Sequence, residues 1–115
     1  MVHAASAAAT ADPAALFAAL GDPTRLRLVS RLSAAGPQSI TSLARVAPVT
    51  RQAVTKHLRA LAAAGVVRSH RQGRESVWEL QPDRLEEARQ HLDAISRQWD
   101  AAIERLRALV ESDAG

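Results

Sequence analysis

Cysteine is absent from this 115-residue sequence, and aromatic residues make up only 3% of it. Without a thiol the chain can form neither disulfides nor thiolate metal sites, and thiol redox switching is excluded as well. A core with so few rings must be filled by Ala, Leu and Val, and a small core often depends on a second subunit for further buried area. The length predicts a single domain.

Long apolar runs are also missing from the sequence. No run approaches the ~20 residues that a membrane-spanning helix needs. The Ala-rich start, residues 1–11, has neither a basic region nor a Leu-rich segment. This composition disfavours a signal peptide and predicts a disordered tail. We therefore expect a soluble, cytoplasmic protein with no membrane partner.

Acidic residues are scarce in one part of the chain and frequent in another. Residues 21–80 hold ten Lys or Arg against three acids, a net charge of +7. Residues 81–115 hold five Arg against eight acids, a net charge of −3. This asymmetry indicates that a polyanion meets the first part and not the second.

Two Asp-Pro pairs predict where the first two helices begin. Asp12-Pro13 and Asp22-Pro23 each place an N-cap residue before a proline at the first helical position. The second helix should end near Gly36. Its apolar spacing predicts that Leu26, Val29 and Leu32 face inward.

Two further helices follow, separated by a tight turn. Thr41 or Ser42 can cap a short third helix, which Pro48 prevents from continuing. Thr50 caps a fourth helix, and Gly65 is expected just past its C-terminal end.

After this glycine the pattern changes to that of strands and then of one long helix. VVRSH and ESVWEL, joined by RQGR, predict a β-hairpin in which Trp78 packs into the core. Pro82-Asp83 opens a final helix, expected over residues 83–112. Its apolar residues are spaced alternately three and four apart, as in a heptad seam: Leu85, Ala88, Leu92, Ile95, Trp99, Ala102, Leu106 and Leu109.

This order of elements predicts a mainly α fold with a β-hairpin wing, a winged helix-turn-helix. The domain should cover residues 12–112, with the long C-terminal helix as a dimerisation helix and residues 113–115 as a tail. A second copy of the chain is the expected cover for the heptad seam. The predicted dimer interface contains Leu16, Phe17, Leu92, Ile95, Trp99, Ile103, Leu106 and Leu109.

The fourth helix, TRQAVTKHLRAL at its start, has no acidic residue. In a helix-turn-helix this helix enters the DNA major groove with its N-terminal residues against base edges. The residues expected to read bases are Arg51, Gln52, Thr55 and Lys56. Those expected to hold the DNA backbone are Thr50, Arg59, Arg68, His70, Arg71 and Arg74. His57 fits a hydrogen-bonded structural or phosphate-contacting residue better than a metal ligand.

Three segments also carry a family resemblance: GDPTRLRLVSRL, LARVAPVTRQAVTKHLRALAAAGVV and RQGRESVWEL. They resemble the signatures of the ArsR/SmtB family of bacterial transcription regulators, over about residues 16–80. The resemblance implies a homodimeric repressor that binds a palindromic operator in double-stranded DNA and releases it on a signal; it names no effector. PVTRQAVTKHL and SRQWDAAIERLRALVE are similar to a branch without the metal ligands, often encoded beside lipid-binding-type (SRPBCC) proteins.

The departure from the metal-sensing members concerns the sensor. Where those members carry a cysteine-containing box, this sequence has SLARVA. Other members place ligands on the last helix, where this chain has only His91, with Asp93, Asp100 and Glu104 nearby in sequence. His91 and Asp93 point to different sides of a helix, which disfavours a zinc site. We expect no metal and no cofactor.

Two rival functions remain. In one, the DNA-binding protein responds to a small hydrophobic ligand at the dimer interface. In the other, the chain is a coiled-coil interaction module whose winged helix binds protein. Catalytic residues are not predicted, because Ser69 and His70 are only sequence neighbours and no Gly-rich phosphate loop is present.

Overall fold

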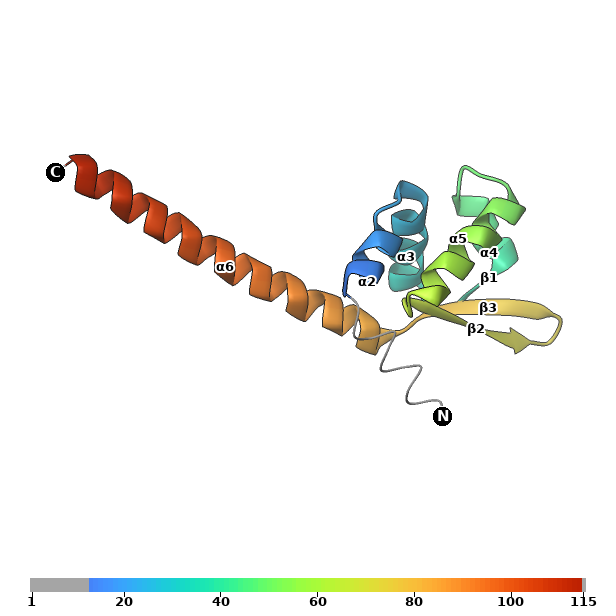
Figure 1. Cartoon of the computed structure of the whole chain (residues 1–115). Helices are drawn as coiled ribbons and strands as arrows, with labels where there is room; N and C mark the ends of the chain where they lie inside the picture. Colours follow the sequence, from blue (N-terminus) through green and yellow to red (C-terminus); the bar gives the residue numbers. More distant parts are fainter. Residues whose placement is uncertain (1–12, 115) are drawn as a thin grey trace.

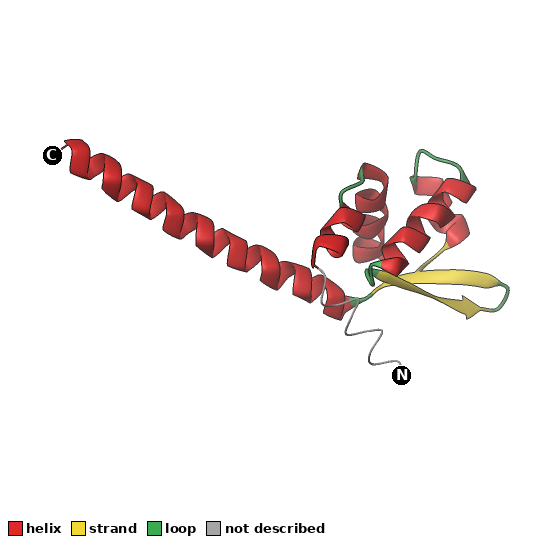
Figure 2. Cartoon of the chain, in the orientation of Figure 1, coloured by secondary structure: helices red, strands yellow, loops and turns green. Residues whose placement is uncertain are grey.

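The computed structural model describes residues 13–114 and shows a small helical body from which one long helix projects (Figures 1 and 2). The elements in chain order are α2 (Pro13–Leu20), α3 (Pro23–Ala35), β1 (Gln38–Ser39), α4 (Ile40–Val46), α5 (Arg51–Ala63), β2 (Val67–Gln72), β3 (Glu75–Leu80) and α6 (Pro82–Ala114). This is the predicted winged helix-turn-helix, with α4 and α5 as its two consecutive helices and β2–β3 as the wing. No helix within these residues is both long and apolar enough to cross a membrane.

The start of α3 follows its local signal. The Asp22 carboxylate accepts a hydrogen bond from the backbone N–H of Arg25 at 3.1 Å, and Pro23 occupies the first turn. The other predicted Asp-Pro cap, at Asp12, and the expected tail at residues 1–11 lie outside the described residues.

The side of α3 that faces the core differs from the prediction. Leu28 and Leu32 are its buried residues, and Val29 packs against the core in part. Leu26, which we expected inside, is 50% exposed. We predicted a buried stripe through residues 26, 29 and 32, but the buried stripe runs through Leu28 and Leu32. Leu26 lies outside this stripe and faces solvent.

The cap of α4 also differs from the prediction. Ser39, and not Thr41 or Ser42, is the N-cap, and its side chain accepts a hydrogen bond from the backbone N–H of Ser42. Ser39 belongs to the unpredicted strand β1, in which it pairs with Val77 of β3. That pairing holds Ser39 in an extended conformation, which an N-cap residue requires.

The ends of α5 are as predicted. The Thr50 hydroxyl oxygen accepts a hydrogen bond from the backbone N–H of Ala53 at 3.1 Å. Beyond the last turn, Gly65 has a φ of 79°, a left-handed conformation that glycine adopts without strain. Val54, Leu58 and Leu61 bury the inner face of the helix.

The three strands form an antiparallel sheet in the order β1-β3-β2. Val67 lies opposite Leu80 and Arg71 opposite Ser76, and Gly73, with a φ of 65°, makes the turn at the wing tip. Residues directly opposite each other share one face of a sheet. Arg71, Ser76 and Trp78 therefore lie on the same face.

The core consists mainly of Leu, Val and Ala, as the low aromatic content predicted. Leu28, Leu43, Leu58 and Leu61 are fully buried, and burial of each such side chain contributes about 1.5–3 kcal/mol. Trp78 belongs to this core with 8% of its surface exposed, which confirms its predicted place.

α6 is longer than predicted at both ends, beginning at Pro82 and continuing through Asp113 and Ala114. Its 33 residues correspond to a length of ~50 Å, and the chain measures 71 × 38 × 20 Å. Only its first turns pack against the body, where Ala88 is buried and Leu85 partly so. The rest projects into solvent (Figure 1).

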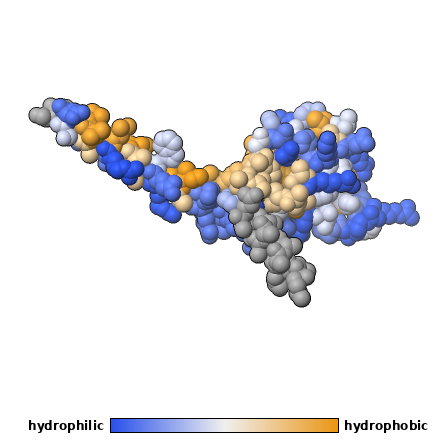
Figure 3. Space-filling view, in the orientation of Figure 1, coloured by the Kyte–Doolittle hydropathy of each residue, from blue (hydrophilic) through white to orange (hydrophobic). Residues whose placement is uncertain are grey.

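The projecting part of α6 carries the apolar seam on its surface (Figure 3). The exposed large apolar residues of this helix are Leu92, Ile95, Trp99, Ile103, Leu106, Leu109 and Val110. Leu16, which we predicted in a dimer interface with them, is instead 1% exposed and belongs to the core of the single chain. It faces inward because α2 packs this side against the body, so only the partly buried Phe17 remains an interface candidate on α2.

Candidate nucleic-acid interface

The outer face of α5 is polar and cationic. Thr50, Gln52, Ala53, Thr55, Lys56 and Arg59 line a shallow hollow along it. Gln52, Lys56 and Arg59 are exposed, and the helix contains no acidic residue. The hollow thus presents amide, ammonium, hydroxyl and guanidinium groups side by side, which are the groups that recognise base edges and phosphates in the major groove.

One member of this set has its donor already engaged. The Thr55 hydroxyl donates a hydrogen bond to the backbone carbonyl of Arg51 at 3.0 Å. Such a bond back to the preceding turn is common for Thr in helices. Thr55 therefore offers a methyl group and an accepting oxygen to an incoming partner, and its hydroxyl hydrogen only after that bond breaks.

Arg51 lies apart from the hollow. It lines a separate recess between α5 and the wing, together with Ile40, Thr55, Arg59, Ser76 and Trp78. The four residues predicted to read bases are consequently divided. Gln52, Thr55 and Lys56 line the hollow, whereas Arg51 lines only the recess, to which Thr55 and Arg59 also belong.

The cationic residues of the wing lie on both faces of the sheet. Arg68 and His70 share a face with Glu79: Nε of Arg68 donates to Oε1 of Glu79 at 2.8 Å, and Nδ1 of His70 lies 4.0 Å from the same oxygen. Arg71 lies on the other face, opposite Ser76, and Arg74 follows the glycine of the tip. The charge of Arg68 is thereby partly offset.

The cations of α5 and of the wing tip, by contrast, have no acidic partner. Within residues 13–114, no carboxylate forms an ion pair with any of Arg51, Lys56, Arg59, Arg71 and Arg74. The arginines of α6 that form ion pairs with a glutamate three residues away are Arg84, Arg89 and Arg107. α5 and the wing tip thus present unpaired positive charge to solvent, which favours binding of a polyanion.

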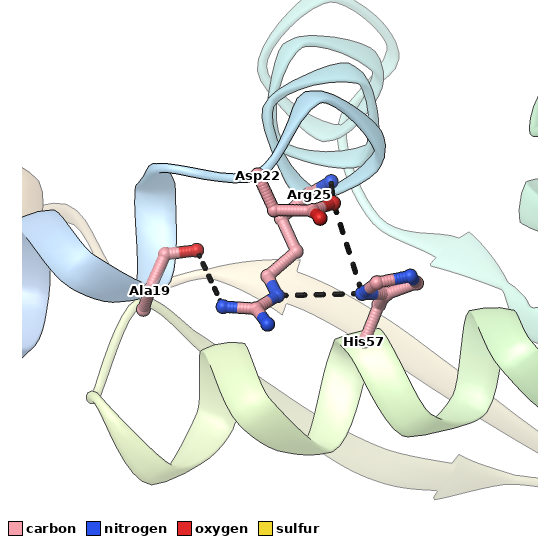
Figure 4. Close-up of polar contacts among 4 residues, drawn as sticks. All are labelled: Ala19, Asp22, Arg25 and His57. Atoms are coloured by element: carbon pink, nitrogen blue, oxygen red, sulfur yellow. Dashed lines mark hydrogen bonds and ion pairs between the residues drawn. The ribbon is translucent and has the colours of Figure 1, made fainter.

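A polar cluster fixes the middle of α5 to the preceding helices (Figure 4). Arg25 donates from Nε to Nδ1 of His57 at 3.3 Å and from Nη1 to the carbonyl of Ala19 at 3.1 Å. His57 Nδ1 also lies 3.9 Å from Oδ2 of Asp22. His57 is therefore a hydrogen-bonded structural residue.

Asp22 is the acidic member of this cluster. The backbone N–H of Arg25 holds the pKa of the Asp22 carboxyl below its usual value, with a further contribution from the nearby His57. The carboxylate thus remains charged while it caps α3, next to the guanidinium of Arg25.

Arg84 fixes the C-terminal end of α5, a role that our sequence analysis missed. Its side chain is 3% exposed; Nε donates to the carbonyl of Ala64 at 2.9 Å, and Nη1 donates to Glu87 at 2.8 Å. A Cβ atom added to Gly65 would lie 3.5 Å from Nε, so the arginine also packs beneath the turn that ends α5. The sequence carries no local signal of this role, because an arginine in the first turn of a helix is usually exposed.

His91, the sole histidine of α6, lies near α2. Its ring centroid is 5.7 Å from that of Phe17, and it borders a hollow with Leu16, Arg84 and Glu87. Residues 13–114 contain no group of three or more His, Cys, Asp or Glu side chains placed to hold a metal ion.

Comparison with known proteins connects this geometry to a family. A family model described as a helix-turn-helix domain matches residues 20–70. The HTH-type transcriptional regulator Rv2034 of Mycobacterium tuberculosis is 38% identical over 102 residues, which cover 89% of this chain and 92% of that protein.

Solved structures give the same result. The ArsR-like transcriptional regulator from Rhodococcus sp. RHA1 is 38% identical with a TM-score of 0.71, over 86% of this chain and 92% of that one. The transcriptional repressor BigR from Xylella fastidiosa is 26% identical with a TM-score of 0.57, over 71% of this chain and 80% of its own. These relatives share the fold on which the exposed face of α5 is built. The chain belongs to the ArsR family of winged helix-turn-helix transcriptional regulators and is a DNA-binding protein.

Proposed function

We propose that this regulator is a homodimeric repressor that binds a palindromic operator and acts without sensing a metal. The observation that carries the proposal is the outer face of α5, with Gln52, Lys56 and Arg59 exposed and no acidic residue along the helix. Gln52, Thr55 and Lys56 read bases in the major groove. The similarity to the repressor BigR supports the direction of regulation.

The DNA backbone is held from the sides of this helix. Thr50 and Arg59 border the hollow of α5, and Arg71 and Arg74 extend the unpaired charge to the wing. Arg68 and His70 make weaker contacts than the sequence suggested, because both lie close to the carboxylate of Glu79.

A second copy of the chain covers the apolar seam of α6. Trp99 is 65% exposed in the single chain, and Leu106 and Leu109 are exposed beside it. Soluble proteins rarely leave a continuous apolar strip of this kind in water. Since the strip repeats as a heptad seam, a matching helix from an identical chain is the partner that fits it. Dimerisation places two copies of α5 on successive turns of DNA.

The absence of thiols gives this proposal a chemical consequence. Arsenite and cadmium prefer thiolate ligands, which this chain lacks. We expect that neither ion, nor zinc, releases operator DNA at stoichiometric concentration, as measured by fluorescence anisotropy of labelled DNA. Release by zinc that disappears in His91→Ala would show instead that the last helix holds a metal site.

The function itself is tested by binding. Genome-wide immunoprecipitation of bound DNA identifies the operator, and titrations against operator and scrambled DNA at several salt concentrations measure specificity. We expect tighter binding to the operator and a steep loss of affinity with salt. A chain that binds neither DNA at low salt, but captures a partner protein through its winged helix, would support the interaction-module alternative.

A further inference from the structure

The recess between α5 and the wing has the composition of an anion site. It has a volume of about 180 Å³ and is lined by Arg51, Thr55 and Arg59 from α5, Ser76 and Trp78 from β3, and Ile40. No carboxylate lines it, and neither arginine has an ion-pair partner in the described part of the chain. Two guanidinium groups and a serine hydroxyl thus border one small space.

A second observation comes from the indole of Trp78. This residue is more than nine-tenths buried, and its Nε1 has no hydrogen-bond partner among residues 13–114. Buried polar groups nearly always have a partner, so an orphaned donor on a residue that lines a recess calls for an acceptor. The missing acceptor can come from a ligand that enters the recess.

The position of the recess indicates which ligand this is. It lies between the base-reading helix and the wing, the two elements that contact DNA in this fold. Phosphate oxygens accept hydrogen bonds and carry the negative charge that two arginines attract. A base edge would present donors as well as acceptors, whereas the groups in this recess are mainly donors.

We propose that a phosphate group of the DNA backbone occupies this recess, held by Arg51, Arg59, Ser76 and the indole N–H of Trp78. This phosphate site rests on the proposed function, and it assigns Arg51 to the DNA backbone instead of to base reading. The Nε1 atom is covered in the free chain, so the lining opens when DNA arrives. Arg51 and Arg59 are exposed, so their side chains are free to turn onto the phosphate.

The charge of the site is tested with Arg51→Ala. We expect about tenfold weaker binding to operator and scrambled DNA alike, and a salt dependence shallower by about one unit, because one phosphate contact is lost. Arg31→Ala is the matched control, since Arg31 is exposed on α3 and lies outside the recess. It should leave the slope unchanged. A change of base preference in Arg51→Ala with an unaltered slope would overturn the proposal.

The indole N–H is tested with Trp78→Phe, which keeps a ring in the core and removes the donor. Affinity for both DNAs should fall about tenfold with the salt slope preserved, because the lost donor is uncharged. If the variant does not fold, Ser76→Ala takes its place, with an expected loss of about threefold. Parental affinity in a folded Trp78→Phe, or in Ser76→Ala in its place, would contradict the proposed site.

Fluorescence distinguishes this proposal from the function on which it rests. The chain has two tryptophans, so Trp99→Phe leaves Trp78 as the sole emitter. We expect operator DNA to change the emission of Trp78, and the change to shrink in the Arg51→Ala background. DNA binding with no change in emission would refute the proposed phosphate site in the recess but not the DNA-binding function. A parent chain that binds no DNA would refute the proposed function.

Discussion

Gln52 and Arg74 test, at the scale of single residues, the division between base reading and backbone contact. Gln52 is exposed in the hollow of α5, where its amide can pair with both N6 and N7 of adenine. Gln52→Ala should therefore remove ~1–3 kcal/mol of discrimination at one base pair in each half of the proposed palindrome. The measurement is a titration against operators substituted at each position. Equal weakening on operator and scrambled DNA would assign Gln52 to the backbone.

Arg74 should behave in the opposite way. It follows the glycine at the wing tip, is exposed, and has no acidic partner within the described residues. Arg74→Ala should weaken binding to all sequences alike and make the salt dependence shallower by about one unit. Arg68→Ala serves as its control in the same titration, because Glu79 already offsets Arg68, and should change the slope less. Altered sequence preference in Arg74→Ala would give the wing a base-reading role.

Residue roles were predictable where they depend on local chemistry. The caps at Asp22 and Thr50 follow from side chains that bond to their own helix within three residues. The cap at Ser39 did not, because strand pairing with Val77, distant in sequence, fixes its conformation. The recess that Arg51 lines together with Trp78 was not predictable either, because it forms only where the wing lies beside α5.

At the scale of elements, Arg84 connects α6 to the end of α5. Arg84→Met keeps the apolar bulk but leaves the carbonyl of Ala64 without this donor, so we expect a loss of about 1–3 kcal/mol in the free energy of unfolding. Urea denaturation followed by circular dichroism measures it. Arg89→Met is the control, because Arg89 pairs with Glu86 at the surface, and it should change stability little. Equal losses in the free energy of unfolding for the two substitutions would mean that the buried hydrogen bond stabilises the fold no more than the surface ion pair does.

The elements themselves were largely predictable, and their packing less so. Proline and glycine positions predicted where α3 begins and α5 ends, and the heptad spacing predicted α6. Our prediction of the inward face of α3 was wrong at Leu26, because the periodicity of apolar residues alone did not decide between Leu26 and Leu28. The two-residue strand β1 had no sequence signal, because its pairing partner lies in the wing.

At the scale of the whole molecule, the apolar seam should decide the oligomeric state. Trp99→Asp places a charge where the seam would be buried, at a cost of several kcal/mol, and should shift the chain toward monomer. Sedimentation equilibrium over a range of concentrations measures the shift. Ala101→Asp adds the same charge on the side of α6 away from the seam, where Ala101 is exposed, and should leave the proposed dimer intact. A parent chain that stays monomeric at micromolar concentration would rule out this interface.

The single long helix also has a geometric consequence for changes in chain length. α6 runs unbroken from Arg84, fixed in the body, to the exposed part of the seam, which begins at Leu92. Inserting one residue between them would rotate everything beyond it by about 100° and turn the seam away from the second chain that we propose as its cover. Inserting seven would bring the seam back to within about 20° of its original direction while moving it ~10 Å outward. Only insertions that restore the direction of the seam should therefore be compatible with the proposed dimer. Such insertions would change the distance between the two winged helix-turn-helix bodies and not their relative orientation.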